Sequence, residues 1–321
     1  MADSTLTAIR AKVRRLTRSP SEAQITTAEI DEYINTYVLY DFPEQLRLFT
    51  LRSTFTFYTN PNIDTYENST TIGNQFYNFK NLYITTHKPA YIAGKPAMFS
   101  QSRAEFFSMY PLNNSIASTG NTGDGATTAF TGTLTSKPVL RNQVLFSSID
   151  ANNNGLRLTD DGDGTLGGDG NGTINYVTGA YTLNFTTAPA QSEVIYSQTR
   201  PYVAAQPNSL LYFENKIILR PVPDKVYRVE FEVYKRPSEL LTVGQSPELE
   251  QWWQLISYGA AKKILEDRLD TETLEQILPS FKEQEMLVER RTIVQQQKER
   301  TATIYVNTKG SGYNGWWTNN Y

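Results

Sequence analysis

The sequence predicts an α+β protein: a core of helices with a small β part, an inserted β domain, and an extended tail. Three observations lead to this prediction. Apolar residues recur at helical spacing near both ends of the chain, residues 111–200 read as short alternating strands between Gly-, Asp-, Asn- and Thr-rich turns, and residues 301–321 follow no period. The core is therefore expected to combine residues 1–110 with residues 201–300, because an inserted domain separates two halves of its host.

The composition limits the possible functions. The chain has 321 residues, a net charge of −3, no Cys and a single His, His87. Without Cys it has no disulfide and no thiolate, and one His cannot build a His-based metal cluster. The net charge gives no overall nucleic-acid signature. No apolar run approaches the ~18 residues of a membrane span, and no apolar segment follows the basic N-terminus as in a signal peptide, so a cytoplasmic protein is expected.

Two helices are expected at the N-terminus. The first has one apolar face and one basic face, with no acidic residue between Ser4 and Ser21. The second begins with a capping box in which Thr26 is the N-cap and Glu29 reaches back to it. The basic face has two interpretations, contact with an acidic partner or nucleic acid, and simple solvation. Its residues are Arg10, Arg14, Arg15 and Arg18.

Strands are expected on both sides of the inserted domain. Residues 48–57 alternate as a half-buried strand does, and a short strand is expected at 82–85. Residues 210–219 predict a hairpin, and residues 227–234 show the clearest alternation in the chain. The rest of residues 60–110 shows no clear pattern.

Helical spacing returns near the C-terminus. A helix is expected to begin near Ser246 and to continue through Ile264, and a second apolar pattern runs from Ile277 to about residue 297. Asp270 and Pro279 interrupt the pattern, which predicts an antiparallel helical hairpin.

Residues 301–321 are expected to form a flexible tail that carries aromatic anchors. Large aromatic side chains on a polar segment have no core to enter, so we expect them to fill a partner's pocket. The alternative is a disordered end. The aromatic residues are Tyr305, Tyr313, Trp316, Trp317 and Tyr321.

Candidate chemistry is sparse. The run from Asp160 to Gly172 is rich in Asp and Gly, which suits calcium, but Leu166 stands where an EF-hand loop needs Gly. Tight turns use the same residues, so turns are favoured and calcium stays open. Glu230 and Glu232 are expected to be neutralised by Arg228 and neighbouring strands rather than to form an acid pair. No catalytic residue, cofactor or metal site is predicted.

Several segments resemble one known family. Lys12–Arg18, Ile25–Thr36 and Tyr40–Glu44 resemble the N-terminus of head-to-tail adaptor (connector) proteins of tailed bacteriophages. Lys216–Asp224 followed by Val229–Pro237 is similar to a strand–turn–strand element of those proteins. Together with the inserted domain, these segments cover most of the chain.

The inserted domain resembles a small β-sandwich module of phage virion proteins, through Gly123–Gly132 and Gly172–Phe185. The resemblance implies a helical-bundle adaptor core with an inserted β-sandwich domain. It further implies a non-enzymatic, homo-oligomeric, twelve-fold ring in the virion neck, assembled in the host cytoplasm. That ring binds the portal protein and tail or nozzle proteins and lines a channel for DNA without sequence specificity or membrane contact. The tail aromatics would then bind the portal or a neighbouring subunit.

One alternative from another class is a glycan-binding tail or surface protein that uses the inserted β domain. Sugar binding needs exposed aromatic side chains, whereas Phe130, Tyr176 and Phe185 fall in strand patterns that suit a core. An enzyme is a more distant alternative, because no acid–base constellation is visible.

Overall fold

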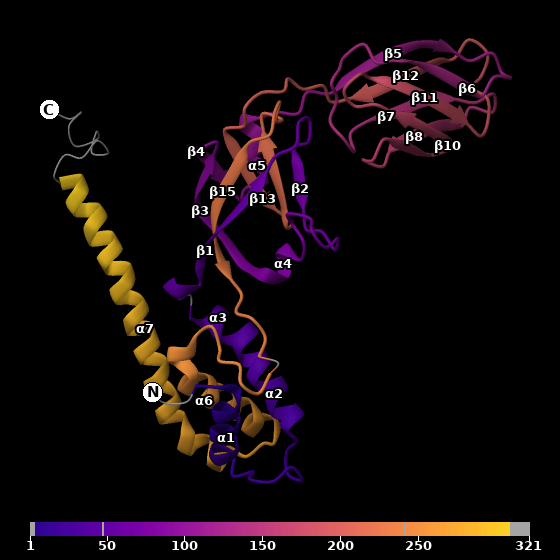
Figure 1. Ribbon diagram of the computed structural model, residues 1–321. Helices are drawn as coiled ribbons and strands as arrows, with labels where there is room; N and C mark the ends of the chain where they lie inside the picture. Colours follow the sequence, from indigo (N-terminus) through magenta and orange to yellow (C-terminus); the bar gives the residue numbers. More distant parts are fainter. Residues whose placement is uncertain (1–3, 47, 241, 309–321) are drawn as a thin grey trace. The chain divides into compact units, whose positions relative to one another are not determined.

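The computed structural model describes residues 4–46, 48–240 and 242–308, and Figure 1 shows the arrangement of their helices and strands. The chain divides into two compact units, and the boundary between them falls within three strands. The first unit is built from Met1–Phe55, Asn78–His87 and Glu232–Tyr321, and the second from Thr56–Tyr77 and Lys88–Phe231.

The expected fold class, a helical-bundle core with a small β part, is wrong. The described chain is mostly β, with one sheet of seven strands and one of eight. Residues 1–110 and 201–300, which were expected to build the helical core, supply all seven strands of the first sheet. Most helices lie in the first unit, together with parts of three strands of that sheet, whereas the helix at Arg103–Met109 belongs to the second unit.

The principal helices of the first unit pack around one apolar core. α1 (Leu6–Leu16) buries Leu6, Ile9 and Val13, the face that its spacing predicts. α2 (Thr27–Thr36) begins with the predicted capping box, in which the Thr26 side chain accepts from the Glu29 amide and the Glu29 carboxylate accepts from the Thr26 amide. The shorter segments are η1 (Tyr37–Asp41), α3 (Phe42–Gln45), η2 (Phe49–Leu51), α4 (Phe79–Leu82) and η3 (Glu250–Trp252).

α6 (Trp253–Asp267) and α7 (Thr271–Thr308) follow each other and are packed together. α6 begins later than Ser246, because the chain first forms turns and the short helix η3. Pro279 lies inside α7 without ending it. α7 continues through residues 301–308, so the first part of the expected extended tail is helical.

The seven-stranded sheet joins segments that are far apart in the sequence. The predicted hairpin is confirmed, and Glu214 and Asn215 at its turn both have positive φ, as a two-residue type I′ turn requires. The strand predicted at 227–234 is also confirmed, with Val229 fully buried. α5 (Arg103–Met109) follows the fourth strand. In sheet order the strands are β1 (Arg52–Tyr58), β15 (Arg228–Lys235), β3 (Tyr83–Ile92), β4 (Lys95–Ser100), β13 (Ser209–Phe213), β14 (Lys216–Arg220) and β2 (Thr65–Glu67).

The inserted domain is a single eight-stranded sheet, so the expected β-sandwich of two stacked sheets is wrong. The sheet curls until its two outer strands meet, and the Asn121 side chain donates to the Thr131 carbonyl across this seam (3.3 Å). In sheet order the strands are β5 (Ser115–Thr122), β12 (Val194–Thr199), β7 (Leu145–Ile149), β8 (Gly155–Asp160), β9 (Thr165–Gly168), β10 (Gly170–Ile174), β11 (Ala180–Phe185) and β6 (Ala129–Thr133).

Two details of this sheet explain its curl and the position of its two ends. Gly132 lies against the Tyr181 ring, where a Cβ would overlap the phenol, so a residue without a side chain allows the tight curl. The first and last strands of the domain in chain order, β5 and β12, are neighbours in the sheet, and Ser115 pairs directly with Thr199. The domain therefore begins and ends at the same place.

Candidate functional site

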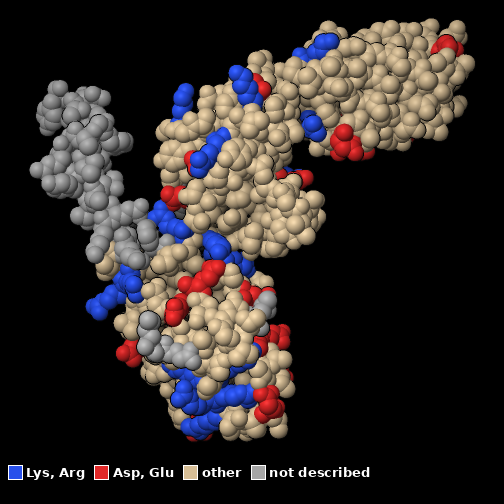
Figure 2. Space-filling model, viewed as in Figure 1, with Lys and Arg blue, Asp and Glu red and all other residues tan. Residues whose placement is uncertain are grey.

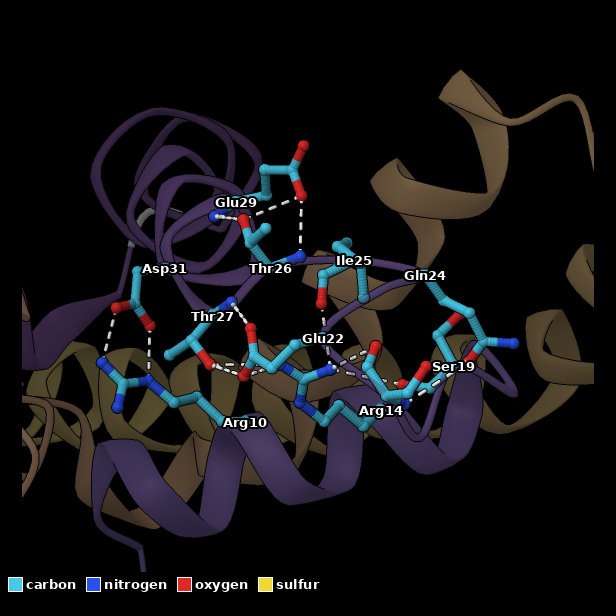
Figure 3. Close-up of polar contacts among 11 residues, drawn as sticks. Arg10, Arg14, Ser19, Glu22, Gln24, Ile25, Thr26, Thr27, Glu29 and Asp31 are labelled. Carbon is cyan, nitrogen blue, oxygen red and sulfur yellow. Dashed lines mark hydrogen bonds and ion pairs between the residues drawn. The ribbon is translucent and has the colours of Figure 1, made fainter.

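The basic face of α1 is partly committed to internal contacts. Arg10 forms a two-pronged ion pair with Asp31 of α2: Nε lies 2.6 Å from Oδ1 and Nη2 lies 2.5 Å from Oδ2 (Figure 3). Both side chains are at least three-quarters buried, so this pair is shielded from solvent more than a surface ion pair. Arg10 therefore ties α1 to α2 and is largely removed from any partner contact.

Arg14 holds the loop between α1 and α2. Its guanidinium donates to the Ile25 carbonyl (3.0 Å) and, at longer range, to the carbonyls of Ser19 and Ser21 (Figure 3). It also pairs with Glu22 (2.7 Å). A guanidinium with several N–H donors can satisfy such a group of loop acceptors at once. Arg14 is thus a structural residue of this loop.

The other two arginines, Arg15 on α1 and Arg18 just after it, are accessible to a partner. Arg15 and Arg18 are exposed, and no ion pair with either is found in the described part of the chain. Arg18 donates to the side chain of Gln276 (2.9 Å). Figure 2 shows Lys and Arg gathered over the part of the helical unit that contains α1. Of the four arginines expected to form a contact face, the structure leaves two accessible.

Lys12 lies beside these arginines, over two aromatic rings. Its Nζ is 4.9 Å from the Trp253 ring centroid and 4.5 Å from that of Tyr258. Partial burial, and then the neighbouring Arg15 charge, lower the pKa of Lys12. Trp253 also packs against the helical core, so its ring serves the packing of the helices.

A second surface lies on α7 and was missed in the sequence. One side of this helix packs inward through Ile277, Phe281 and Val288. Four apolar side chains on the opposite side are between 44% and 63% exposed. We call them the α7 stripe: Met286, Leu287, Ile293 and Val294.

The α7 stripe lines a shallow apolar groove together with Glu283, Glu289 and Arg290. After Val288, no side chain up to Val294 is buried. Here α7 extends past the other helices of its unit (Figure 1). The sequence carries the signal, apolar residues on two opposite sides of one helix, but only the packing shows which side remains uncovered.

The side chains of the tail aromatics lie outside the part of the chain that the structure describes. Tyr305 belongs to α7, but its side chain lies outside the described residues. The other four also lie outside them: Tyr313, Trp316, Trp317 and Tyr321.

The Asp- and Gly-rich run forms turns and strand ends. Asp160 accepts from the Gly162 amide (2.8 Å), and Asp163 accepts from the amide and hydroxyl of Thr165 (2.9 and 2.6 Å). The Asp169 carboxylate accepts from a backbone amide of β8. These carboxylates are occupied by turn hydrogen bonds, as the turn interpretation expects. Within the described residues, no group of three or more His, Cys, Asp or Glu could hold a metal ion.

The other candidate residues, Glu230, Glu232 and His87, lie in strands of the seven-stranded sheet. Glu230 pairs with Arg228 (2.5 Å) and Glu232 pairs with Arg52, so the predicted neutralisation is confirmed. His87, the single His of the chain, lies in β3. The helices thus offer two surfaces for contact: the exposed Arg15 and Arg18 at the end of α1, and the apolar stripe on α7.

No protein-family model matches the chain, and no curated protein matches it. No helix in the described part of the chain is long and apolar enough to cross a membrane.

Proposed function

We propose that this chain is a structural virion protein, a head-to-tail adaptor whose copies form a ring that joins the portal to the tail and lines the DNA channel. It would act in the virion neck after assembly in the host cytoplasm, with no catalytic role and no cofactor. The observation that carries the proposal is the α7 stripe. Contiguous exposed apolar side chains on a soluble domain mark a surface that a protein partner covers.

The geometry of α7 suits repeated association. The helix is anchored to its own unit by Phe281 and Val288, and the α7 stripe faces the other way. A helix with two apolar sides can pack on its own chain and on a second copy at the same time. When the second copy uses a different surface to receive it, the contact is head-to-tail, and repetition closes a ring if the rotation permits.

Two of the segments that resemble adaptor proteins fold together, which supports the proposal. Lys12–Arg18 lies in and just after α1, and Ile25–Thr36 contains α2; both pack around one core with α6. The exposed Arg15 and Arg18 supply positive charge that fits an acidic portal surface or DNA bound through its phosphates.

The glycan-binding alternative has less support. Phe185 and Tyr176 are buried in the inserted domain, and Phe130 packs against the same core. Tyr196 is half-exposed, but a single ring is a poor sugar platform. The inserted domain would then be a contact module on the outside of the ring.

Electron microscopy of the purified chain, alone and with assembled portal, tests the proposal. The expected result is a ring with a central hole, formed alone or on the portal. Because a ring can need the portal as template, monomers alone decide nothing, whereas monomers in the presence of assembled portal would overturn the proposal.

The aromatic tail is proposed as an anchor to the portal or a neighbouring subunit. Ordering a backbone residue costs roughly 1–2 kcal/mol, and a buried aromatic hot spot contributes about 2 kcal/mol or more. Truncation after Thr308 removes Tyr313, Trp316 and Trp317 but keeps α7 complete. It should preserve the fold and weaken attachment, and equal attachment by the truncated and full-length chains would remove the tail from the proposal.

A further inference from the structure

A cleft in the second unit gathers positive charge that the proposed function does not explain. It has a volume of about 450 Å³ and lies where residues of α5, β2 and the β13–β14 hairpin meet residues at the edge of the inserted domain. All of its lining residues belong to one compact unit. Its size is within the range of sites for small molecules, about 300–1,000 Å³.

The lining carries more positive than negative charge. Its cationic residues are Arg103, Arg141, Arg200, Lys216 and Arg220, and its acidic residues are Asp64, Glu67 and Glu214. This local excess is notable because the whole chain has a net charge of −3.

Two of the acidic residues are already paired. Arg220 binds Asp64 at 2.5 Å, and the exposed fractions of these side chains are only 9% and 13%. Lys216 binds Glu67 at 2.8 Å. These two acids are therefore engaged by Arg220 and Lys216, which leaves Glu214 as the one other acidic residue in the lining.

Three guanidinium groups remain without a carboxylate partner among the described residues: Arg103, Arg141 and Arg200. Arg141 lies over the Tyr176 ring (4.9 Å) and donates weakly to the Gly162 carbonyl, and Arg103 lies over the Phe107 ring (5.8 Å). A ring holds a guanidinium in place without consuming its N–H donors. Two of the three groups are thus partly positioned before any ligand arrives.

We infer that this cleft binds a ligand with linked phosphate groups. Guanidinium groups match phosphate oxygens with paired hydrogen bonds, and several of them converging on one cleft favour a multiply charged anion over a single carboxylate. The cleft is larger than one phosphate needs, so adjacent phosphates can contact different arginines. The phosphates can come from a free oligophosphate or from the backbone of a nucleic-acid strand.

Calorimetric titration of the full chain tests this inference, with inorganic tripolyphosphate and a single-stranded oligonucleotide of about six nucleotides as probes. Arg141→Gln and Arg200→Gln should each weaken binding about tenfold, the effect of losing one charged hydrogen-bonding group. Neither residue forms an ion pair in the described structure, so both variants should melt like the parent. Arg200→Lys keeps the charge but loses the planar fork, so it should weaken binding less than Arg200→Gln.

Arg157→Gln is the matched control, because Arg157 is an exposed arginine of the same inserted domain that does not line the cleft. It should change binding less than about twofold. Binding of tripolyphosphate alone would identify a free oligophosphate as the ligand, and binding of the oligonucleotide with the same sensitivity to Arg141 and Arg200 would identify a nucleic-acid backbone. The inference is overturned if neither probe binds at millimolar concentration, or if Arg157→Gln weakens binding as much as the cleft variants do. Both results are independent of ring formation.

Discussion

The ring of Tyr37 lies directly against the α-carbon of Gly259. A Cβ built on Gly259 would overlap three atoms of the phenol ring, closer than real Cβ contacts come. Gly259 lies inside α6, where glycine is normally unfavourable. The close approach of Tyr37 therefore explains why a glycine stands in the middle of this helix.

Gly259→Ala should destabilise the protein despite the better helix propensity of alanine. Alanine gains about 1 kcal/mol as a helix former, whereas overpacking a core costs typically 1–3 kcal/mol. Because the added Cβ would come within 2.2 Å of the Tyr37 ring, the cost should lie in the upper part of that range. We therefore expect a net loss of about 1–2 kcal/mol in the free energy of unfolding, measured by urea denaturation. Gly244→Ala is the control, because a Cβ there meets no atom within 4 Å, and it should be nearly neutral. An equally stable Gly259→Ala variant would show that the ring moves aside freely.

Tyr37→Phe should leave stability unchanged or increase it by up to about 1 kcal/mol. The Tyr37 hydroxyl is buried and has no hydrogen-bond partner in the described structure. Burial, and then the charge of Glu285, raise the pKa of Tyr37, so the hydroxyl is neutral at ordinary pH. Removing an unsatisfied polar group removes its desolvation cost. A clearly lower melting temperature would indicate a partner that this packing does not show.

Arg14→Gln should lower stability, whereas Arg15→Gln should weaken binding. Arg14 holds loop carbonyls and is mostly buried, so its loss should cost about 2 kcal/mol of stability. Arg15 is exposed, so its loss should change stability by less than about 0.5 kcal/mol and should weaken binding to an acidic partner or DNA instead. Thermal melting and a binding assay, run on both variants, separate the two roles. Equal melting temperatures for the two variants would contradict the structural role of Arg14.

Charged substitutions in the α7 stripe should prevent assembly without unfolding the chain. Leu287→Lys combined with Ile293→Lys places two charges on side chains that are already half-exposed, so the monomer should keep its melting temperature. Sedimentation or light scattering in the presence of the portal should show loss of higher-order species. Leu269→Lys is the control, because Leu269 is 84% exposed and lies outside the α7 stripe. Assembly that survives the double substitution would place the interface elsewhere.

Thr127→Val should raise the pKa of Asp124. Hydrogen bonds from the Thr127 side chain and backbone, and from the Ala126 amide, lower the pKa of Asp124 to about 2. Because this pKa is below its unfolded value of about 3.9, the associated stabilisation is present at neutral pH and is lost as pH falls from about 4 towards 2. Thr127→Val removes the largest cause, so an NMR titration should show a higher midpoint. Asp163, whose pKa is lowered by Thr165, should titrate unchanged.

Local signals in the sequence predicted local structure well. The capping box at Thr26 and Glu29, the hairpin turn at Glu214 and Asn215, and the alternation around Val229 each depend on residues close in the chain. Each of these features is therefore determined by a continuous segment of about ten residues or fewer.

The seven-stranded sheet could not be predicted in the same way. Its order places β3 between β15 and β4, and β13 pairs with β4 in parallel, so neighbouring strands come from distant segments. β2 has only three residues, too few to show a period. The contact roles of the arginines were equally hidden, because Arg14 and Arg15 are adjacent and identical in kind, and only the loop carbonyls around Arg14 distinguish them.

Because Ser115 pairs directly with Thr199, the inserted domain can be exchanged as a single unit. The host chain enters and leaves the insertion at nearly one point. The insertion therefore joins two host segments in the way that a simple hairpin turn would join them. Any β domain whose first and last strands are neighbours can occupy that position without shifting the strands on either side. The inserted domain of such a protein can thus be exchanged independently of its helices, and one scaffold can carry different modules in different surroundings.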